Sequence, residues 1–354
     1  MLTTNKNVFS LEAANNQPCY KGGPATLICK AVIEETADSK TFIFEDSQSR
    51  SFDFKPGQYL TFRFEIDGEI WPRAYSICST PTRPHNVQVT VKRVPDGKVS
   101  NWINNTLAPG MSVEVDNLSG AFNYIDIDAR KPLFLSGGSG ITPVMSMLQY
   151  ITDVVDDTDA VFIHFARSPE NIIFKDQLEF LSRRYENIDV HFVVDACDEE
   201  DRFDGTVGLI SSGLIRDLVP DLEERSIFMC GPEGFMRTAR TIAREMNVIT
   251  IHEESFGEKI VLTDRSELGG EIFFSRSGKS SVCASSETVL DAALNAGLWI
   301  DSSCQQGICG NCKVLLTQGE VDMTDLGGLQ DHEREQGYIL ACCSRPKGAI
   351  SVDA

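Results

Sequence analysis

Four cysteines give the chain its clearest chemical signal. Cys304, Cys309 and Cys312 follow the pattern C-x4-C-x2-C, and Cys342 lies further along the chain. Four thiolates, two for each iron, are what a [2Fe–2S] cluster requires, and this spacing is one that such clusters use. A structural zinc site is the alternative, but zinc sites usually pair two short C-x2-C hairpins, whereas three of these cysteines share one loop. The sequence therefore predicts an iron–sulfur cluster at these four residues.

The fourth ligand could be either of two adjacent residues, Cys342 or Cys343. The stretch resembles the plant-type ferredoxin pattern in which a proline lies four residues after the last ligand, and Pro346 is four residues after Cys342. This resemblance selects Cys342 and implies that Cys343 is a packing residue. Gly307 and Gly310 suit a loop whose backbone N–H groups approach the inorganic sulfurs closely.

A second group of candidate residues lies in the string Arg73-Ala74-Tyr75-Ser76. An arginine can bind a pyrophosphate with two hydrogen bonds, a tyrosine can stack on a flavin ring, and a serine hydroxyl can hydrogen-bond the flavin N5. Further on, Gly97-Lys98-Val99-Ser100 begins a predicted helix, whose N-terminal N–H groups suit the same pyrophosphate. Taken alone, the first string also fits an ordinary β-strand, and the second fits an ordinary turn and helix cap.

A third group surrounds a glycine-rich turn. The string Ser136-Gly137-Gly138-Ser139-Gly140-Ile141-Thr142-Pro143 follows a predicted buried strand and opens a predicted helix. Strand, glycine turn and helix together can cradle a phosphate, although Pro143 replaces the third glycine of the dinucleotide-binding motif. Cys230-Gly231-Pro232 ends a later strand, and ligands of open α/β sheets bind at the carboxyl ends of strands. Both strings should therefore face one crevice, although a purely structural turn is the alternative for the first.

The elements that must position these residues fall into successive regions. Residues 25–128 contain short alternating or β-branched runs between turn residues, which predict an antiparallel β-barrel. Residues 129–252 alternate apolar runs with helical stretches, which is typical of a parallel sheet covered on both faces. Residues 253–270 are polar and carry charges of both signs, so we interpret them as a linker. Residues 271–354 hold the cysteines as a further domain, and residues 1–24 form a flexible lead. The helices expected in the second region span Thr142–Val155, Glu170–Tyr185, Ser211–Val219 and Gly234–Met246.

The composition narrows the class of protein. A chain of 354 residues is long enough for two or three domains. Its net charge of −20, from 32 basic and 52 acidic residues, disfavours nucleic acid and anionic membranes as partners. It has no apolar run of about 18 residues, and its N-terminal stretch lacks the apolar core of a signal peptide. Eleven cysteines without such a signal favour a reducing compartment. We therefore expect a cytoplasmic monomer that does not bind a membrane.

The motifs in order carry a resemblance to a known family. R-x-Y-S-x-x-S, G-x-x-S, G-G-x-G-I-T-P and C-G-P follow one another as in the ferredoxin–NADP reductase superfamily. With a ferredoxin-like C-terminal region, the chain resembles the NADH-dependent reductases of two-component oxygenases, including quaternary amine (glycine betaine) monooxygenases, and of the hybrid-cluster protein. The resemblance implies an antiparallel β-barrel FAD domain, an α/β parallel-sheet NAD domain and a β-grasp-like α+β ferredoxin domain.

The resemblance also implies roles for the residues named above. Electrons would pass from NADH through FAD and the [2Fe–2S] cluster to a metalloprotein acceptor, either a Rieske-type oxygenase or, alternatively, the hybrid-cluster protein. Tyr75, Ser76 and Cys230 would act at the reacting rings, and the segment 252–256 resembles the one that closes over the flavin region. The implied FAD-binding residues are Arg73, Tyr75, Ser76, Gly97, Lys98, Val99 and Ser100, and the implied nucleotide-binding residues are Gly138, Gly140, Thr142, Pro143, Cys230, Gly231 and Pro232.

Three alternatives remain beside this interpretation. FMN could replace FAD, in which case Gly97–Ser100 would meet one phosphate. The chain could be a redox-sensing module with vestigial nucleotide sites, but the intact Arg73, Tyr75 and Ser76 disfavour this. A quinone-reducing subunit usually has its ferredoxin region first and a membrane anchor, and neither is expected here.

The choice between NADH and NADPH depends on the stretch after the predicted strand Val190–Val194. Reductases of this superfamily that use NADPH typically place Ser and Arg there. This chain has five carboxylates in the seven residues Asp195–Asp201, which would repel the extra phosphate of NADPH. Arg167, at the end of the preceding strand, could reach that phosphate, and a solvated loop beyond reach of the ribose is the alternative. We expect NADH to be preferred.

Overall fold

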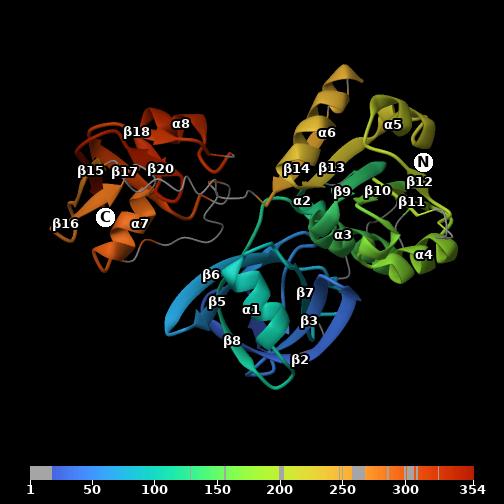
Figure 1. The fold of residues 1–354 in the computed structure, drawn as a ribbon, viewed down its shortest axis with the longest axis horizontal. Helices are drawn as coiled ribbons and strands as arrows, with labels where there is room; N and C mark the ends of the chain where they lie inside the picture. Colours follow the sequence, from blue (N-terminus) through green and yellow to red (C-terminus); the bar gives the residue numbers. More distant parts are fainter. Residues whose placement is uncertain are drawn as a thin grey trace, which may run out of the picture.

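The computed structural model contains three main sheets. It describes residues 18–127, 129–154, 157–198, 203–246, 248, 250–256, 268–284, 287–298, 300, 307, 310–325 and 327–354. Figure 1 shows a barrel and a parallel sheet packed against each other, with a third, mixed sheet standing apart from both. No helix in the described part of the chain is long and apolar enough to cross a membrane.

The barrel is a six-stranded antiparallel sheet with strand order β6-β5-β8-β2-β3-β7. A bridge between Ile77 and Val89 joins its two edges, so the sheet closes on itself. Leu60, Phe62 and Phe64 alternate inward along one strand and lie buried in the barrel core, as the period of a strand requires. The elements are β2 (Ala25–Thr36), β3 (Ser39–Asp46), β5 (Tyr59–Ile66), β6 (Glu69–Ser76), β7 (Val87–Lys92), β8 (Ser112–Ser119) and helix α1 (Lys98–Thr106), with β1 (Cys19–Tyr20), β4 (Ser51–Phe52) and α2 (Tyr124–Ile127) beside them.

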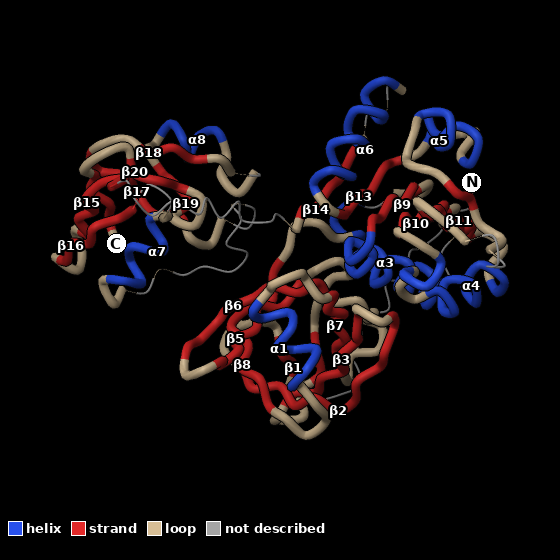
Figure 2. The backbone as a smooth tube through the Cα atoms, in the orientation of Figure 1, coloured by secondary structure: helices blue, strands red, loops and turns tan. Residues whose placement is uncertain are grey.

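The second sheet is parallel and has the order β12-β11-β10-β9-β13-β14. Its helices cover both faces (Figure 2), as strand–helix alternation requires. The strands are β9 (Pro132–Gly137), β10 (Ala160–Ala166), β11 (Ile188–Val194), β12 (Thr206–Val207), β13 (Ser226–Gly231) and β14 (Ile251–Ser255). Helices α3 (Ile141–Val154) and α4 (Lys175–Arg184) pack on one face, and α5 (Ser212–Leu218) and α6 (Glu233–Glu245) pack on the other; the 3-10 turns are η2 (Gly138–Gly140), η3 (Pro169–Asn171) and η4 (Leu222–Glu224).

Four rings lie side by side across the face of this sheet that carries α3. Phe162, Phe134, Phe228 and His252 are register partners on four successive strands. The Phe134 and Phe228 ring centroids are 5.3 Å apart, and those of Phe228 and His252 are 5.0 Å apart, which is within the range of favourable aromatic contacts. This row forms a rigid apolar layer beneath the residues that end the strands.

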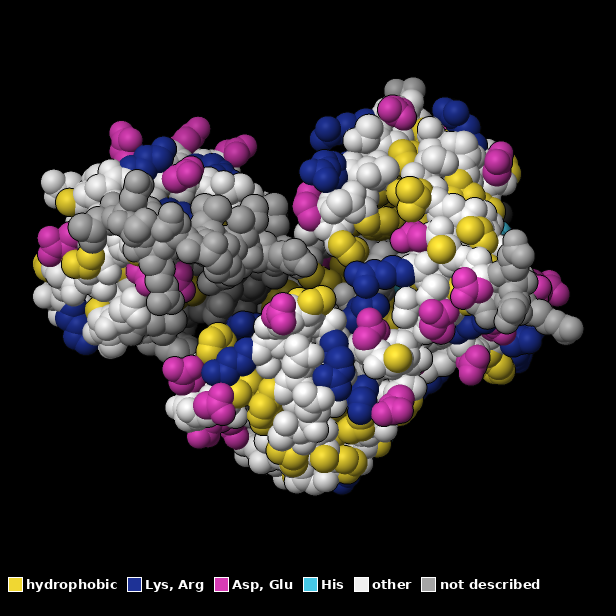
Figure 3. All heavy atoms as spheres, viewed as in Figure 1, with side chains coloured by type: hydrophobic (Ala, Val, Ile, Leu, Met, Phe, Trp, Pro, Cys, Tyr) yellow, Lys and Arg dark blue, Asp and Glu magenta, His cyan; other side chains and the backbone are white. Residues whose placement is uncertain are grey.

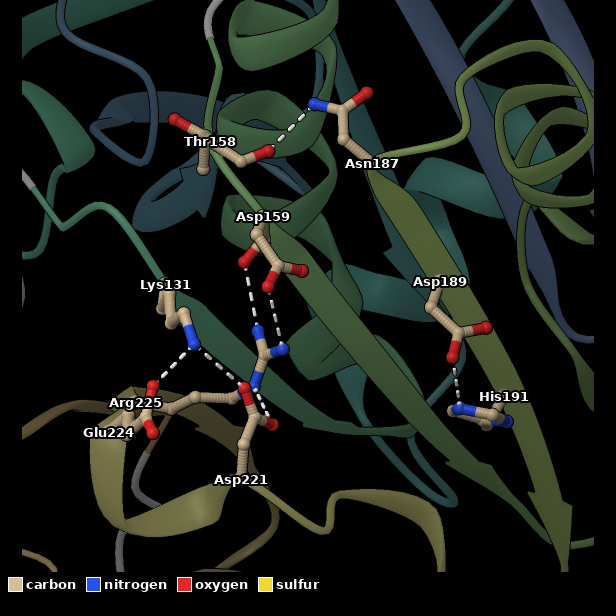
Figure 4. A network of polar contacts seen from close by, with 9 residues as sticks. All are labelled: Lys131, Thr158, Asp159, Asn187, Asp189, His191, Asp221, Glu224 and Arg225. Carbon is tan, nitrogen blue, oxygen red and sulfur yellow. Dashed lines mark hydrogen bonds and ion pairs between the residues drawn. The ribbon is translucent and has the colours of Figure 1, made fainter.

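A network of charged residues lies at the opposite, amino edge of the same sheet (Figure 4). Arg225 precedes β13, and its guanidinium donates to Asp221 Oδ1 at 2.6 Å, to the Asp159 carbonyl oxygen at 2.8 Å and to Asp159 Oδ2 at 3.1 Å. Lys131, before β9, pairs with Asp221 and Glu224. The network therefore ties together the starts of the three central strands.

The barrel meets the parallel sheet along α3. Ser146 Oγ donates to the Ser79 carbonyl oxygen at 2.6 Å, and both residues are buried. At the end of the same helix, Asp153 accepts from Thr82 and from Arg83, whose Nη2 lies 2.6 Å from the carboxylate. These contacts hold the end of β6 beside the carboxyl edge of the parallel sheet.

The third sheet is mixed and has the order β16-β15-β21-β17-β19. Helix α7 packs on it and contributes Val289, Leu290 and Ala293 to its core. The architecture confirms the expected α+β domain. Its elements are β15 (Leu268–Phe274), β16 (Lys279–Ala284), α7 (Val289–Asn295), β17 (Lys313–Gln318), β18 (Val321–Met323), α8 (Asp331–Glu335), β19 (Tyr338–Leu340), β20 (Ser344–Pro346) and β21 (Ile350–Asp353).

Two expectations about element boundaries differ from the structure. The linker expected from residue 253 lies partly in the sheet, because β14 runs to Ser255 and its buried Glu254 pairs in register with Cys230. At the other end of that region, β15 begins at Leu268. The helix expected from Glu170 begins at Lys175, because Phe174 has a positive φ of 58° and caps it, with its ring buried. The other helices of this region agree with expectation to within one residue at each end.

Candidate active site

One hydrogen bond joins the barrel to the end of the parallel sheet. Ser76 is the last residue of β6, and its Oγ donates to Glu254 Oε2 on β14 at 3.3 Å. Both side chains are buried, with 5% and 6% of their residue surfaces exposed. Two of the expected features, the Arg73–Ser76 string and the 252–256 segment, therefore meet at this point.

A row of polar side chains continues from this contact across the carboxyl half of the sheet. Glu254, Cys230, Ser136 and His164 are register partners on β14, β13, β9 and β10. Register partners on neighbouring parallel strands point to the same face, so these groups share the α3 face with the aromatic row below them. Ser136 Oγ and His164 Nδ1 are hydrogen-bonded at 2.7 Å. The row places Cys230 between Ser136 and Glu254.

Burial keeps this row electrically neutral. It raises the pKa of Glu254 to about 8, against the smaller opposing effect of the Ser76 hydrogen bond. Burial, and then the nearby Glu254 carboxyl group, hold the pKa of the Cys230 thiol well above its ordinary value. Burial also lowers the pKa of His164 to about 3. At neutral pH the row therefore presents a protonated carboxyl group, a thiol and a neutral imidazole, which can hold or pass a proton without a fixed charge.

The side chains expected to bind a flavin pyrophosphate lie further back along β6. Arg73 is partly buried, and its Nη1 donates to the Pro72 carbonyl oxygen at 2.7 Å, but among the described residues it has no carboxylate partner. Burial lowers the pKa of its guanidinium, as expected for a cation without a counter-charge. A partly buried cation that lacks an anion fits a phosphate ligand. Tyr75 packs beside Phe62 and Phe64, with ring centroids 6.1 and 6.3 Å away.

The turn Gly97–Ser100 leads into α1, which has no acidic residue in its first turn and no side-chain cap. The hydroxyl of Ser100 accepts from the Val94 N–H at 3.1 Å and so holds the turn closed. A Cβ added at Gly97 would lie 2.7 Å from this hydroxyl, so a larger residue there would displace the Ser100 side chain from its bond to Val94. The N-terminal N–H groups of α1 are left without an acidic side chain, as a phosphate site requires.

The glycine-rich turn after β9 packs against the end of β13. A Cβ added at Gly140 would lie 2.2 Å from the Cys230 carbonyl oxygen, so only glycine allows this approach. Gly138 has a φ of +52° and open space around it, which leaves room for a ligand. Thr142 Oγ1 donates to the Ser139 carbonyl oxygen at 3.1 Å, and Pro143 lies in the first turn of α3. The structure thus brings the two predicted nucleotide strings together.

The cysteine-rich module is described in part. Cys304 and Cys309 lie outside the described residues. Cys312 and Cys342 are both buried, and the Cys342 thiol interacts with those of Cys312 and Cys343. The Gly307 N–H donates to Cys342 Sγ at 3.3 Å, which is the kind of donor that stabilises a cluster thiolate. Two of the four expected ligands, Cys312 and Cys342, are therefore in contact, and the Gly307 N–H donates to the second of them.

Sequence reasoning gave no role to three residues of this row, namely Glu254, Ser136 and His164, and Glu254 is the one that contacts the barrel. The segment 252–256 was expected near the flavin by resemblance, but no role was given to any residue in it. The usable signal was the alternation of a short strand: Glu253 is exposed and pairs with Arg240 at 2.7 Å, while Glu254 faces inward. Two adjacent glutamates on a strand point to opposite faces of the sheet, so an exposed Glu253 leaves Glu254 on the other face.

The comparisons with known proteins cover all three sheets. Three family models match: an oxidoreductase FAD-binding domain over residues 25–124, an oxidoreductase NAD-binding domain over residues 134–241 and a 2Fe-2S iron–sulfur cluster binding domain over residues 272–347. The structure is similar to that of phthalate dioxygenase reductase, with a TM-score of 0.69 and 26% identity, over 94% of this chain and 98% of that chain.

Two relatives extend this similarity. The glycine betaine monooxygenase reductase subunit of Pseudomonas aeruginosa is 40% identical over 94% of this chain and 96% of its own length. The NADH oxidoreductase HCR of Escherichia coli is 28% identical over 78% of this chain and 82% of its own length. The chain therefore belongs to the family of oxidoreductases with FAD-binding, NAD-binding and 2Fe-2S domains that includes the glycine betaine monooxygenase reductase subunit.

Proposed function

We propose that this protein takes electrons from NADH and passes them through FAD and a [2Fe–2S] cluster to a partner metalloprotein. The first candidate partner is a Rieske-type monooxygenase that acts on a quaternary amine such as glycine betaine. The observation that carries this proposal is the full-length similarity to the reductase subunit of glycine betaine monooxygenase, which spans all three domains. The contact between Ser76 and Glu254, beside Cys230, supports this proposal because it brings the predicted flavin and nucleotide residues together.

The proposal assigns the domains and the binding residues as the sequence predicted them. Residues 25–128 would bind FAD, residues 129–252 with the rest of β14 to Ser255 would bind the nicotinamide nucleotide, and residues 271–354 would bind the cluster, so that the linker starts after Ser255. Bound FAD would convert the two-electron chemistry of NADH into single-electron transfer. The proposed residues are Arg73, Tyr75, Ser76 and Gly97–Ser100 for FAD, Gly138, Gly140, Thr142, Pro143 and Cys230–Pro232 for the nucleotide, and Cys304, Cys309, Cys312 and Cys342 for the cluster.

The protein's own residues would position the rings and manage a proton. Tyr75 offers an aromatic face that is fixed by the barrel core. The Ser76 hydroxyl is oriented by Glu254, whose raised pKa lets its carboxyl group hold a proton near neutral pH. The Cys230 thiol is buried and neutral and lies next to Glu254 in the row, where the nicotinamide ring would lie.

NADH is the proposed donor because of the charge at the end of β11. The Asp195 N–H donates to the Ala166 carbonyl oxygen at 3.0 Å, and the Ala196 N–H donates to that of Arg167 at 3.1 Å. These bonds hold Asp195 and Arg167 at the carboxyl edge, where the nucleotide would lie. Part of the acidic run, residues 199–202, lies outside the described residues.

A hybrid-cluster protein is the second candidate acceptor. It is favoured by the similarity to the E. coli NADH oxidoreductase HCR, at lower identity and coverage than the first candidate. Purified acceptors of both kinds, each mixed with the NADH-reduced protein, would separate them by the rate of acceptor reduction. We further propose that the protein is cytoplasmic, which the free cysteines of the described residues support, and that it is a monomer, which light scattering would test.

The test of the pathway compares two adjacent cysteines. Cys342→Ser should lose or destabilise the cluster, so NADH would still reduce ferricyanide but would no longer reduce cytochrome c efficiently. Cys343→Ser should keep both activities. Iron and sulfide content, with EPR of the reduced protein, reports the cluster directly. A normal cluster and full cytochrome c reduction in the Cys342 variant would show that the ligand or the route is wrong.

A further inference from the structure

One indole ring lies between the two cations of the proposed flavin phosphate site. Trp71 is on β6, two residues before Arg73, so both side chains leave the same side of the strand. The Trp71 ring centroid lies 5.6 Å from the Arg73 guanidinium carbon and 4.8 Å from Lys98 Nζ. Lys98 is the first residue of α1. The ring therefore links the strand and the helix terminus that are proposed to hold one pyrophosphate.

Apart from this ring, the Arg73 guanidinium donates to the Pro72 carbonyl oxygen, and Lys98 makes only weak ion pairs. Lys98 Nζ lies 3.3 Å from Asp67 and 3.7 Å from Glu69, but those carboxylate side chains are 80% and 67% exposed. Exposed ion pairs of this kind contribute little. Figure 3 shows Lys and Arg side chains gathered over the region of α1 and β6. The contact with Trp71 is thus the common feature that fixes both cations.

The buried position of the indole is unfavourable for its N–H group. Trp71 packs against the barrel core opposite Phe64, and its Nε1 is buried with no hydrogen-bond partner among the described residues. A buried donor without an acceptor is unfavourable, and a phenylalanine at this position would avoid that cost. A compensating gain is available, because tryptophan is the aromatic side chain that attracts cations best.

We propose that Trp71 is a positioning residue for the FAD pyrophosphate, holding Arg73 and Lys98 together at one anion site. This inference rests on the proposed FAD-binding role of the barrel. Two cations at one site repel each other. A carboxylate placed between them would relieve the repulsion but would compete with the phosphate. An aromatic face attracts both cations and leaves their charge available to the ligand.

The test measures flavin binding by the apoprotein, without any turnover. Trp71→Leu should weaken FAD binding about tenfold, whereas Trp71→Phe should keep most of the affinity because it keeps a π face. Trp102→Leu is the matched control: Trp102 lies on α1 and packs on Phe64 with ring centroids 6.0 Å apart, and no cation of the described residues lies over its ring. That control should bind FAD like the parent protein. Thermal unfolding confirms that each variant is folded.

Riboflavin separates this inference from the proposed function. It has no phosphate, so Trp71→Leu should weaken FAD and FMN binding but leave riboflavin affinity unchanged. Equal loss of riboflavin and FAD affinity, or equal affinities of the Leu and Phe variants for FAD, would overturn the role of Trp71 while the flavin function stood. If the apoprotein without any substitution fails to bind FAD, the proposed function is wrong, and this inference is wrong with it.

Discussion

Buried ionisable groups are charged and paired at the amino edge of the parallel sheet, and neutral at its carboxyl edge. At the amino edge, the Arg225 side chain is 5% exposed and bonds to carboxylates of Asp159 and Asp221. At the carboxyl edge, Glu254 and Cys230 are equally buried, but no cation bonds to either among the described residues. The side chains at the amino edge are therefore charged. Glu254 and Cys230 at the carboxyl edge are neutral, because burial raises the pKa of both groups.

This difference separates groups that stabilise from groups that react. Against the effect of burial, the carboxylates hydrogen-bonded to the buried Arg225 cation raise its pKa, so it stays protonated and its loss would destabilise the fold. A buried carboxyl group without a cation beside it has a raised pKa, and the pKa of Glu254, about 8, suits proton transfer near neutral pH. The edge with ion pairs therefore serves the fold, and the edge with neutral groups serves the proposed chemistry.

The largest expected effect is a loss of folding stability when the charge network at the amino edge is broken. Arg225→Met should lower the free energy of unfolding by about 2 kcal/mol, because it removes the hydrogen bonds of a buried guanidinium to Asp159 and Asp221, while Lys131 still pairs with Asp221 and both carboxylates remain partly exposed to water. Denaturant unfolding measures this loss. Arg183→Met removes an exposed partner of Glu179 and should change stability by less than about 0.5 kcal/mol. Lower kcat/KM for NADH in folded Arg225→Met protein would contradict the separation between the two edges.

Glu254→Gln should change how stability depends on pH. The folded pKa of Glu254, about 8, lies above its unfolded value, so the folded state binds the extra proton and the wild type loses stability as pH rises toward 8. The variant lacks this loss. Its stability relative to wild type should therefore rise by about 1.4 kcal/mol per pH unit between pH 6 and 7. A relative stability that stays constant from pH 5 to 8 would show that Glu254 is already ionised.

Gly140→Ala should damage the carboxyl edge selectively. The new Cβ would meet the Cys230 carbonyl oxygen, so either the turn or the end of β13 must shift. A cost of about 1.4 kcal/mol would lower kcat/KM for NADH about tenfold, while FAD content stays normal. Gly234→Ala, at an open position in α6, is the matched control and should leave both unchanged. Loss of FAD together with NADH use would place the damage in the barrel instead.

The smallest expected effect concerns nucleotide choice at the same edge. Asp195→Ser removes one carboxylate and should raise kcat/KM for NADPH by a factor of up to about ten. Asp198→Ser changes the net charge equally and should have a smaller effect if the position of Asp195 is decisive. Steady-state rates with both nucleotides at fixed ionic strength decide this. Equal or better use of NADPH by the wild type would refute the proposed donor.

Local signals in the sequence were enough for the elements and for the glycine turns. Strand period and turn residues predicted the barrel, and strand–helix alternation predicted the parallel sheet. The turn around Gly140 was recognisable because a strand, a glycine turn and a helix follow one another directly. The helix expected to start at Glu170 starts only at Lys175 in the structure. The left-handed conformation of Phe174, which accompanies the burial of its ring, could not be predicted from local sequence.

The sequence by itself determined the groups whose chemistry depends on close spacing: the cysteine pattern around Gly307, and the strings at Arg73 and Gly138. Only the tertiary structure decided that Glu254 faces Ser76 and that Trp71 lies between Arg73 and Lys98. The physical reason is that these contacts join separate strands and helices. Which residues meet across them depends on strand register and burial, and the resulting pKa of Glu254 depends on the loss of water around it.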